Sequence, residues 1–374
     1  MPDTVGPQLE PKLIPTLARD IRDVVLRAKQ AGFKATIRRG FSDLEGFYLS
    51  THSQARLAGM RPARRWLFLS AWLLKSLFLK LTPARRVLLL LAFFLMWRSS
   101  TDITRDQVRV VIDVGFSGVV VLLIVLMLEL KDKLLARTEL EAGRSVQLAL
   151  MPDRAPVLPG WDTWLYTRSA NDVGGDLVDY LQIDARRLGV MLGDVAGKGL
   201  PAALLMAKLQ ATLRALVSEA VSLGNLGAQV NGILCRDGLP NRFATLVYLE
   251  VAPGSGRVQL LNAGHMPPIV VRSSRVEQLP TGSVALGIMS GATFAGQEIE
   301  LQPGDMLIVY SDGITEAMNA SEEFFGDERL RTVVSTARPL AAAQAGANIL
   351  AAVDAFVGDA PVHDDMSVVI LKCT

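Results

Sequence analysis

The sequence LGVMLGDVAGKGLPAALLMA, residues 188–207, decides the fold. Its first part, Leu188–Gly193, is a short apolar run that ends in a glycine, which predicts a buried β-strand. The part from Leu200 to about Ala220 is rich in Leu and Ala, which predicts a helix. Asp194 therefore lies at a strand end, where its side chain is held rigidly and the adjacent glycine leaves room for a ligand.

The same segment could be mistaken for a phosphate-binding loop. Such a loop requires GxxxxGK followed by Ser or Thr, whereas Gly199 follows Lys198 here. We therefore reject nucleotide binding at this position. A nucleotide-dependent signalling enzyme, such as a cyclase, is disfavoured for the same reason.

Three further aspartates lie at the ends of apolar strands: Asp176 in VGGD, Asp312 in LIVYSDG and Asp364 in HDDMSVVIL. Taken singly, each is an ordinary turn or helix-capping residue, as we assign Asp305 to be. Taken as a set with Asp194, they repel one another unless a cation neutralises them. Oxygen ligands without His or Cys favour Mg²⁺ or Mn²⁺. Two such ions ~3.5–4 Å apart can hold a hydroxide and clamp a phosphoryl group.

Beyond Pro152, short apolar runs are mixed with helical stretches. Strands are predicted at Trp164–Thr167, Leu177–Ile183, Leu188–Gly193, Phe243–Val251, Arg257–Asn262, Ile269–Arg272, Glu298–Leu301, Met306–Tyr310 and Met366–Leu371. Helices are predicted at Leu200–Ala220, Leu223–Arg236, Asp327–Thr336 and Ala341–Val357. Because the two kinds of element do not alternate regularly, the fold class is α+β with antiparallel strands.

The motifs, taken in order, resemble the bacterial PP2C-like (PPM-type) serine/threonine phosphatases of the SpoIIE/RsbU family. ELEAGRSVQLALMP resembles the helix that leads into the family's catalytic domain, SANDVGGDLVDY its first acidic motif, and residues 188–207 its second. FATLVYLEV, LLNAGHMPP, ALGI and GDMLIVYSDGITEA follow in family order, and HDDMSVVIL closes the domain. The resemblance covers more than 200 residues, and so many ordered motifs are highly specific.

The resemblance implies an α-β-β-α sandwich with two Mn²⁺ or Mg²⁺ ions in a cleft at one end of the sheets. In that arrangement Asp194 bridges both ions, the carbonyl of Val195 binds one, and Asp176, Asp312 and Asp364 complete the ligands. The implied reaction is hydrolysis of protein phosphoserine or phosphothreonine by metal-bound hydroxide. The implied substrate is a STAS-type anti-sigma-factor antagonist in a partner-switching pathway.

Other polar residues of these motifs receive lesser roles. Asp365 is a weaker candidate ligand than its neighbour, and Asp179 is expected to orient the first acidic motif. Lys198 could reach a substrate phosphate, although loop lysines are usually solvated. His265 is expected to cap the turn after a strand.

The sequence departs from the family's eukaryotic relatives at one position. Those proteins have a histidine shortly after the bridging aspartate, where this chain has Val195, Ala196 and Gly197. No clear phosphate-binding arginine lies in the first acidic motif, although Arg168 is near it. The general acid is therefore not identified, and low intrinsic activity on small phosphoesters is expected.

Residues 66–130 contain three apolar stretches. Trp66–Leu79 contains Lys75, which favours an interfacial helix. Val87–Trp97 is intensely apolar but short, and Val108–Leu130 exceeds the ~20 residues that cross a bilayer. We predict an interfacial helix followed by a two-helix membrane hairpin, with three crossings as the alternative.

The charge distribution orients this membrane region. Residues 1–86 hold 16 Lys/Arg against 6 Asp/Glu, and residues 1–65 include one amphipathic helix. The positive-inside rule places the basic segment and the catalytic domain in the cytoplasm, at the inner (cytoplasmic) membrane. Anionic membrane lipid, rather than nucleic acid, is the expected partner of this segment.

Residues 131–151 are predicted to form a linker helix before the phosphatase domain at 152–374. Together with Leu130 just before it, Leu134, Leu140 and Val146 give it an apolar stripe, which is not a strict heptad. It is either an ordinary connecting helix or a dimerising helix that carries a signal to the catalyst. We favour the second, and hence a homodimer, because the stripe follows a predicted membrane segment.

Cysteine and histidine usage excludes other metal chemistry. The two cysteines, Cys235 and Cys373, form no CxxC motif, and the chain has 3 His. A zinc site is therefore not expected, and reduced thiols fit a cytoplasmic domain. The rival hypothesis is a membrane-tethered, non-catalytic binding module with the phosphatase fold, and the intact acidic set argues against it.

Overall fold

A computed structural model describes residues 75, 78–98, 101–105, 108–112, 114–152, 154–171, 173–237 and 242–374. The chain forms two compact units, Met1–Lys131 and Asp132–Thr374. The predicted segment 1–65 and most of Trp66–Leu79 lie outside the described residues.

Two five-stranded antiparallel sheets form the centre of the second unit. The first has the order β10-β7-β6-β5-β4 and consists of β4 (Leu177–Asp184), β5 (Arg187–Val195), β6 (Ala244–Val251), β7 (Arg257–Ala263) and β10 (Gly296–Glu300). The second has the order β3-β12-β11-β8-β9 and consists of β3 (Trp161–Arg168), β8 (Ile269–Val271), β9 (Val276–Gln278), β11 (Met306–Tyr310) and β12 (Met366–Cys373). Every predicted strand is found, whereas the three-residue β9 was not predicted.

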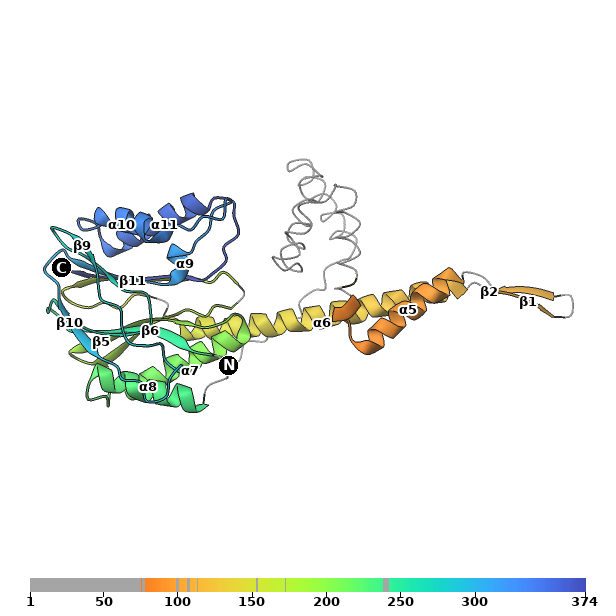
Figure 1. Cartoon of the computed structure of the whole chain (residues 1–374), viewed down its shortest axis with the longest axis horizontal. Coiled ribbons are helices and arrows are strands. Elements are labelled where there is room, and N and C mark those ends of the chain that lie inside the picture. The colour runs from red at the N-terminus through yellow and green to blue at the C-terminus, as the bar shows by residue number, and fades with distance from the viewer. Residues whose placement is uncertain are drawn as a thin grey trace, which may run out of the picture. The chain divides into compact units, whose positions relative to one another are not determined.

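Helices cover the outer face of each sheet (Figure 1). The first sheet carries α7 (Leu200–Leu216) and α8 (Leu223–Asp237), and the second carries α10 (Gly326–Ser335) and α11 (Ala342–Val357). A four-residue helix, α9 (Asp312–Thr315), follows β11 and was not predicted. The four layers confirm the predicted α-β-β-α sandwich.

Several strands, among them β5, β11 and β12, are buried on both faces, which explains why they are continuous apolar runs. In β11, Leu307 and Val309 enter the core between the sheets, whereas Met306, Ile308 and Tyr310 enter the core beneath α10 and α11. This alternation follows from the two-residue period of a strand. Strands packed on both faces give the residues at their ends a rigid base.

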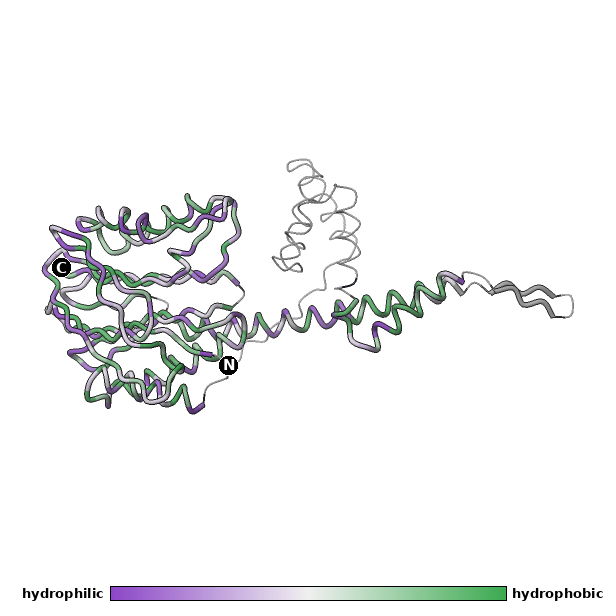
Figure 2. The backbone as a smooth tube through the Cα atoms, viewed as in Figure 1, coloured by the Kyte–Doolittle hydropathy of each residue, from purple (hydrophilic) through white to green (hydrophobic). Residues whose placement is uncertain are grey.

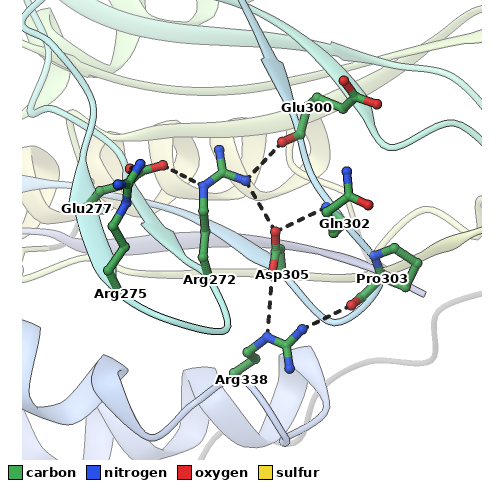
Figure 3. A network of polar contacts seen from close by, with 8 residues as sticks. All are labelled: Arg272, Arg275, Glu277, Glu300, Gln302, Pro303, Asp305 and Arg338. Atoms are coloured by element: carbon green, nitrogen blue, oxygen red, sulfur yellow. Dashed lines mark hydrogen bonds and ion pairs between the residues drawn. The ribbon is translucent and has the colours of Figure 1, made fainter.

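Asp305, assigned to a turn, anchors the connection from β10 to β11 (Figure 3). It is 2% exposed, and its carboxylate accepts the backbone N–H of Gln302 at 3.1 Å. Its two oxygens also pair with Arg272 at 3.2 Å and Arg338 at 3.5 Å. The turn assignment is therefore confirmed, and the two ion pairs additionally join it to β8 and to the chain after α10.

The first unit contains α5 (Pro83–Trp97), β1 (Thr101–Arg105), β2 (Val108–Ile112) and the start of α6 (Val114–Leu150). The prediction of one helix over Val108–Leu130 was wrong at its beginning, because VRVVI pairs with β1 as a β-hairpin. Four of those five residues are β-branched, which favours a strand. From Val114 the helix continues through the predicted linker to Leu150, which confirms that the linker is helical.

Apolar side chains are exposed on both helices of the first unit, and Figure 2 shows α5 and the beginning of α6 as largely hydrophobic. Trp97 is 90% exposed and Phe116 70%. Arg85 Nη1 lies 2.8 Å from Glu129 Oε2 and ties the two helices together. In the described part of the chain, no helix combines the length and apolar character needed to cross a membrane. The predicted membrane hairpin is therefore not confirmed.

Candidate active site

Strand pairing brings Asp176 and Asp194 together at one end of the first sheet. Leu177 at the start of β4 pairs with Gly193 near the end of β5. Asp176 immediately precedes β4, and Asp194 is the penultimate residue of β5. Antiparallel pairing therefore places the two carboxylates on adjacent strand ends, as the sequence predicted.

The second sheet contributes Asp312 and Asp364 in the same way. Tyr310 at the end of β11 pairs with Val368 near the start of β12. Asp312 begins α9 two residues after β11, and Asp364 lies two residues before β12. The predicted aspartates thus come from neighbouring strands of both sheets: β4 and β5 in the first, and β11 and β12 in the second.

The predicted aspartates are partly or fully buried and lie close enough together to raise one another's pKa values. Burial, followed by the charges of Asp312 and Asp364, raises the pKa of Asp194 to about 7. Burial and the charge of Asp194 raise the pKa of Asp176 well above its usual value. The pKa of Asp312 is also raised, first by burial and then by Asp364. Like charges gathered in a desolvated place favour a bound cation.

A small pocket lies beside Asp194 and Asp364, two of the four predicted ligands. It is lined by Asn171, Val173, Gly175, Asp194, Gly197, Lys198, Asp364 and Asp365. Asp176 Oδ2 is buried and has no hydrogen-bond partner among the described residues. Such an orphaned oxygen is rare in a folded protein, and an ion at this place would give it a partner.

Gly175 keeps the approach to Asp194 open. A Cβ at this position would lie 3.1 Å from the carbonyl oxygen of Val195 and 3.2 Å from Asp194 Oδ1. The two predicted oxygen donors therefore face the same small space. In the side-chain positions described, no three His, Cys, Asp or Glu residues are grouped closely enough to hold a metal ion. The ligand set consequently stays a prediction.

Comparison with known proteins decides the family. Residues 184–374, about half of the chain, match the family model described as "Stage II sporulation protein E (SpoIIE)". The chain belongs to the SpoIIE family. This confirms the resemblance on which the sequence interpretation rested.

Two curated relatives of this SpoIIE-family chain extend the comparison. Protein IcfG of Synechocystis is 30% identical over 230 residues, which are 54% of this chain and 36% of IcfG. Phosphoserine phosphatase RsbU of Bacillus subtilis is 22% identical over 238 residues, which are 63% of this chain and 70% of RsbU. The chain thus spans only about a third of IcfG.

Solved structures share the fold. The SiaA-PP2C domain of Pseudomonas aeruginosa superposes with a TM-score of 0.56 at 18% identity, covering 64% of this chain and 98% of that domain. The structure of the PP2C phosphatase domain with a fragment of the regulatory domain of SpoIIE from Bacillus subtilis gives 0.50 at 19% identity, covering 57% of this chain and 61% of that one. Both support the PP2C-like sandwich.

Asp365 positions the first acidic motif of this SpoIIE-family domain. Its Oδ1 accepts the N–H of Ala170 at 2.7 Å, and its Oδ2 accepts the N–H of Gly175 at 2.6 Å. The carboxylate is 6% exposed. Because both oxygens accept backbone donors, Asp365 holds the loop before Asp176, and it also lines the pocket beside Asp194.

Asp179 fixes β4 against α7, in line with its predicted orienting role. Arg214 donates to both of its oxygens, at 2.7 and 2.8 Å, and Gln210 Nε2 donates at 2.7 Å. The partners Arg214 and Gln210 were not singled out in the sequence. Their spacing of four residues places them on the same face of a helix, and this was the only feature of the sequence that could have indicated a shared partner.

Gln147, near the end of α6, is a functional residue that sequence reasoning missed. Its Nε2 donates to the carbonyl of Gly174 at 2.8 Å, and its Oε1 accepts the N–H of Gly174 at 3.1 Å. The side chain is buried. This two-point contact ties α6 to the loop that carries Asp176.

Replacing Gln147 by Leu is expected to destabilise the domain by about 2–4 kcal/mol, because both backbone groups of Gly174 would be buried without partners. Phosphate release should fall at least tenfold, since Gly174 lies two residues from Asp176. Urea unfolding and a phosphate-release assay would measure both. Ser145→Ala, an exposed change on the same helix, is the control, and equal stability of the two variants would contradict the assignment.

His265 joins the two sheets behind the acidic residues. Its backbone N–H donates to Asn262 Oδ1 at 2.9 Å, which confirms the predicted turn role. Its Nε2 lies 3.1 Å from the carbonyl of Tyr310, and its Nδ1 lies 2.7 Å from the hydroxyl of Thr245. Since the carbonyl only accepts, Nε2 carries the proton and Thr245 donates to Nδ1. Burial lowers the pKa of His265 to about 4.

His265→Gln is expected to retain the bond to Tyr310 and lose the bond to Thr245, which costs about 1–2 kcal/mol at pH 7.5. The lowered pKa of His265 means that its stabilising contribution is complete above pH ~6.5 and is lost as pH falls through 4. The free energy of unfolding, measured with urea, should therefore differ less between wild type and variant at pH 4.5 than at pH 7.5. A constant difference would contradict a buried, neutral imidazole.

Two cations near the site have carboxylate partners. Arg168 pairs with Asp354 of α11 at 2.7 Å. Lys198 Nζ lies 3.0 Å from Asp364 Oδ2 while its side chain stays 58% exposed, so its two predicted roles, substrate contact and simple solvation, both stay predictions. The partners in each pair are far apart in the sequence, so the sequence did not predict either contact. Arg242, which donates to the carbonyl of Ala196 at 2.7 Å, was not singled out in the sequence.

Proposed function

We propose that the second unit is a metal-dependent protein phosphatase that hydrolyses phosphoserine or phosphothreonine. The observation that carries this proposal is the convergence of Asp176, Asp194, Asp312 and Asp364 from both sheets, with a pKa of about 7 at Asp194. Membership of the SpoIIE family and similarity to the phosphoserine phosphatase RsbU support the same chemistry.

Two Mn²⁺ or Mg²⁺ ions would be held by these four carboxylates and the carbonyl of Val195, with Asp194 between them. When bound, the ions supply a water nucleophile of lowered pKa and positive charge opposite the phosphoryl oxygens. The chain's own contribution is to hold the carboxylates on strand ends. Asp365 and Gln147 fix the loop that carries Asp176.

His265 does not supply the leaving-group proton. Both of its ring nitrogens are engaged, it is 6% exposed, and burial holds its pKa near 4. No histidine occupies 195–197. The general acid is therefore not His265, and a group on the substrate protein is our candidate, which would favour protein substrates over small phosphoesters.

The substrate that best fits the family is a phosphorylated anti-sigma-factor antagonist of the STAS class, within a partner-switching pathway. Incubation of the full chain with such a phosphoprotein and Mn²⁺ should release phosphate, and Asp312→Asn should release none. Undiminished release by Asp312→Asn would overturn the metal assignment. Metal-independent binding without release would instead identify a non-catalytic binding module.

We also propose that the first unit associates with membrane lipid and that the second acts in the cytoplasm. The exposed apolar side chains of α5 and of the beginning of α6 support this proposal, together with the basic composition of residues 1–86. Co-sedimentation with vesicles of anionic lipid tests it, and retention in the supernatant would overturn it.

A homodimer through α6 is a separate proposal. Leu134, Leu135 and Val146 are exposed on this helix within the second unit. Sedimentation of the full chain should give twice the 40.5 kDa chain mass, and Leu134→Glu should shift it towards the monomer. A monomeric wild type would overturn this proposal without affecting the phosphatase assignment.

A further inference from the structure

Lys198 lies in the loop between β5 and α7, which carries it to the second sheet's side of the acidic residues. Its ammonium donates to the carbonyl of His363 at 2.7 Å and lies 3.0 Å from Asp364 Oδ2. The glycines on either side of Lys198 have φ values of 109° and 75°. These left-handed conformations favour glycine and shape the loop at this point.

The Asp364 carboxylate is engaged at both oxygens. Oδ2 pairs with Lys198, and Oδ1 accepts the N–H of Asp365 at 3.0 Å. Asp364 is also one of the four proposed metal ligands. In the described structure, the positive charge beside this ligand comes from the chain itself.

We propose that Lys198 is an internal counter-cation of the site. It neutralises Asp364 while no divalent ion is bound, and it must release Oδ2 before that oxygen can bind a divalent cation. The released ammonium stays at the rim of the pocket, where it binds the phosphoryl group of the substrate. This inference rests on the proposed metal-dependent phosphatase function.

The exposure of the pair sets the size of the effect. The side chains of Lys198 and Asp364 are 58% and 47% exposed. Exposed ion pairs of this kind change an equilibrium constant by about two- to fivefold. The ion pair between Lys198 and Asp364 is therefore strong enough to lower metal affinity measurably. It is also weak enough for a divalent cation to displace the ammonium group. A charged hydrogen bond to phosphate changes kcat/KM by about tenfold or more.

The inference predicts two changes of opposite sign in Lys198→Met. Calorimetric titration of the metal-free full chain should show Mn²⁺ binding about two- to fivefold tighter than in wild type. At saturating Mn²⁺, kcat/KM for the phosphoprotein should be about tenfold lower. Lys198→Arg, which keeps the charge, should stay close to wild type in Mn²⁺ affinity.

Arg242 provides the matched control for a general charge effect. Its Nη1 donates to the carbonyl of Ala196 at 2.7 Å, and its guanidinium packs over Gly197 in the same loop. Among the ion pairs of the described residues, none involves Arg242. Arg242→Met removes a nearby positive charge without freeing a carboxylate, so its Mn²⁺ affinity should rise less than that of Lys198→Met.

Each outcome separates this inference from the proposed function. Tighter Mn²⁺ binding and weaker kcat/KM in Lys198→Met, larger than any effect in Arg242→Met, support it. Unchanged or weaker Mn²⁺ binding by an active Lys198→Met overturns the inference and leaves the phosphatase intact. An equal rise in Mn²⁺ affinity in both variants would mean that any nearby positive charge has the same effect, and it would also overturn the inference. Absence of Mn²⁺ binding in wild type and variants overturns both proposals.

Discussion

Asp194→Asn is expected to abolish phosphate release, by at least a thousandfold, and at the same time to stabilise the metal-free protein at pH 8. The loss of activity follows because Asp194 is the carboxylate proposed to lie between both ions. The gain in stability follows from its pKa of about 7, which burial and neighbouring carboxylates raise. Ionising Asp194 in the folded, metal-free protein is therefore unfavourable.

The sign of the pH dependence is fixed by that raised pKa. The contribution of Asp194 is most favourable below pH ~4 and is lost as pH rises through 7. The variant should therefore exceed wild type by on the order of 2–4 kcal/mol at pH 8, and the difference should vanish near pH 4. Urea unfolding in the presence of a chelator measures this difference.

Asp184→Asn is the matched control at the opposite end of β4. Asp184 is exposed, and hydrogen bonds from Arg187 lower the pKa of its carboxyl. Its replacement should leave phosphate release unchanged and should not stabilise the protein at pH 8. A destabilised Asp194→Asn in metal-free buffer would show that the carboxylates are not in electrostatic conflict.

Asp365→Asn is expected to lower both stability and activity, because Asp365 holds the loop before Asp176. Its carboxylate accepts the N–H groups of Ala170 and Gly175 at 2.7 and 2.6 Å. An amide must turn its NH₂ group towards one of these donors, which leaves that donor buried without an acceptor. The expected costs are about 2–4 kcal/mol in unfolding free energy and at least tenfold in kcat.

Asp359→Asn controls for charge in the same chain segment, because Asp359 is exposed and lies six residues before Asp365. It should behave as wild type in thermal unfolding and phosphate release. If Asp365→Asn keeps full stability yet loses activity, Asp365 is a ligand and not a positioning residue.

The sequence predicted the four aspartates because each adjoins an apolar run that is long enough to be a strand. Strands that are buried on both faces have continuous apolar sequences, so these strands can be recognised from the sequence alone. The short elements β9 and α9 carry too few residues for a periodic signal. Hydropathy also concealed the change from strand to helix near Val114, because β-branched residues are common to buried strands and apolar helices.

The positioning contacts could not be predicted in the same way. Gln147 reaches Gly174 across 27 residues, and Asp365 reaches Gly175 across 190. Such pairs depend on how the helices, strands and loops pack in the folded domain, and no local sequence pattern predicts them. Lys198 and Asp364 are separated by 166 residues, so the sequence did not predict their contact.

Two adjacent glycines in the loop before Asp176 are held by hydrogen bonds. Gln147 of α6 bonds to Gly174, and Asp365, which directly precedes β12, accepts the N–H of Gly175. These anchors come from opposite ends of the domain in the order of synthesis. A nascent chain that has emerged only as far as β11 holds Gln147 but lacks Asp365, Asp364 and the strand that follows them. During translation we therefore expect the proposed site to stay incomplete until β12 has joined the second sheet.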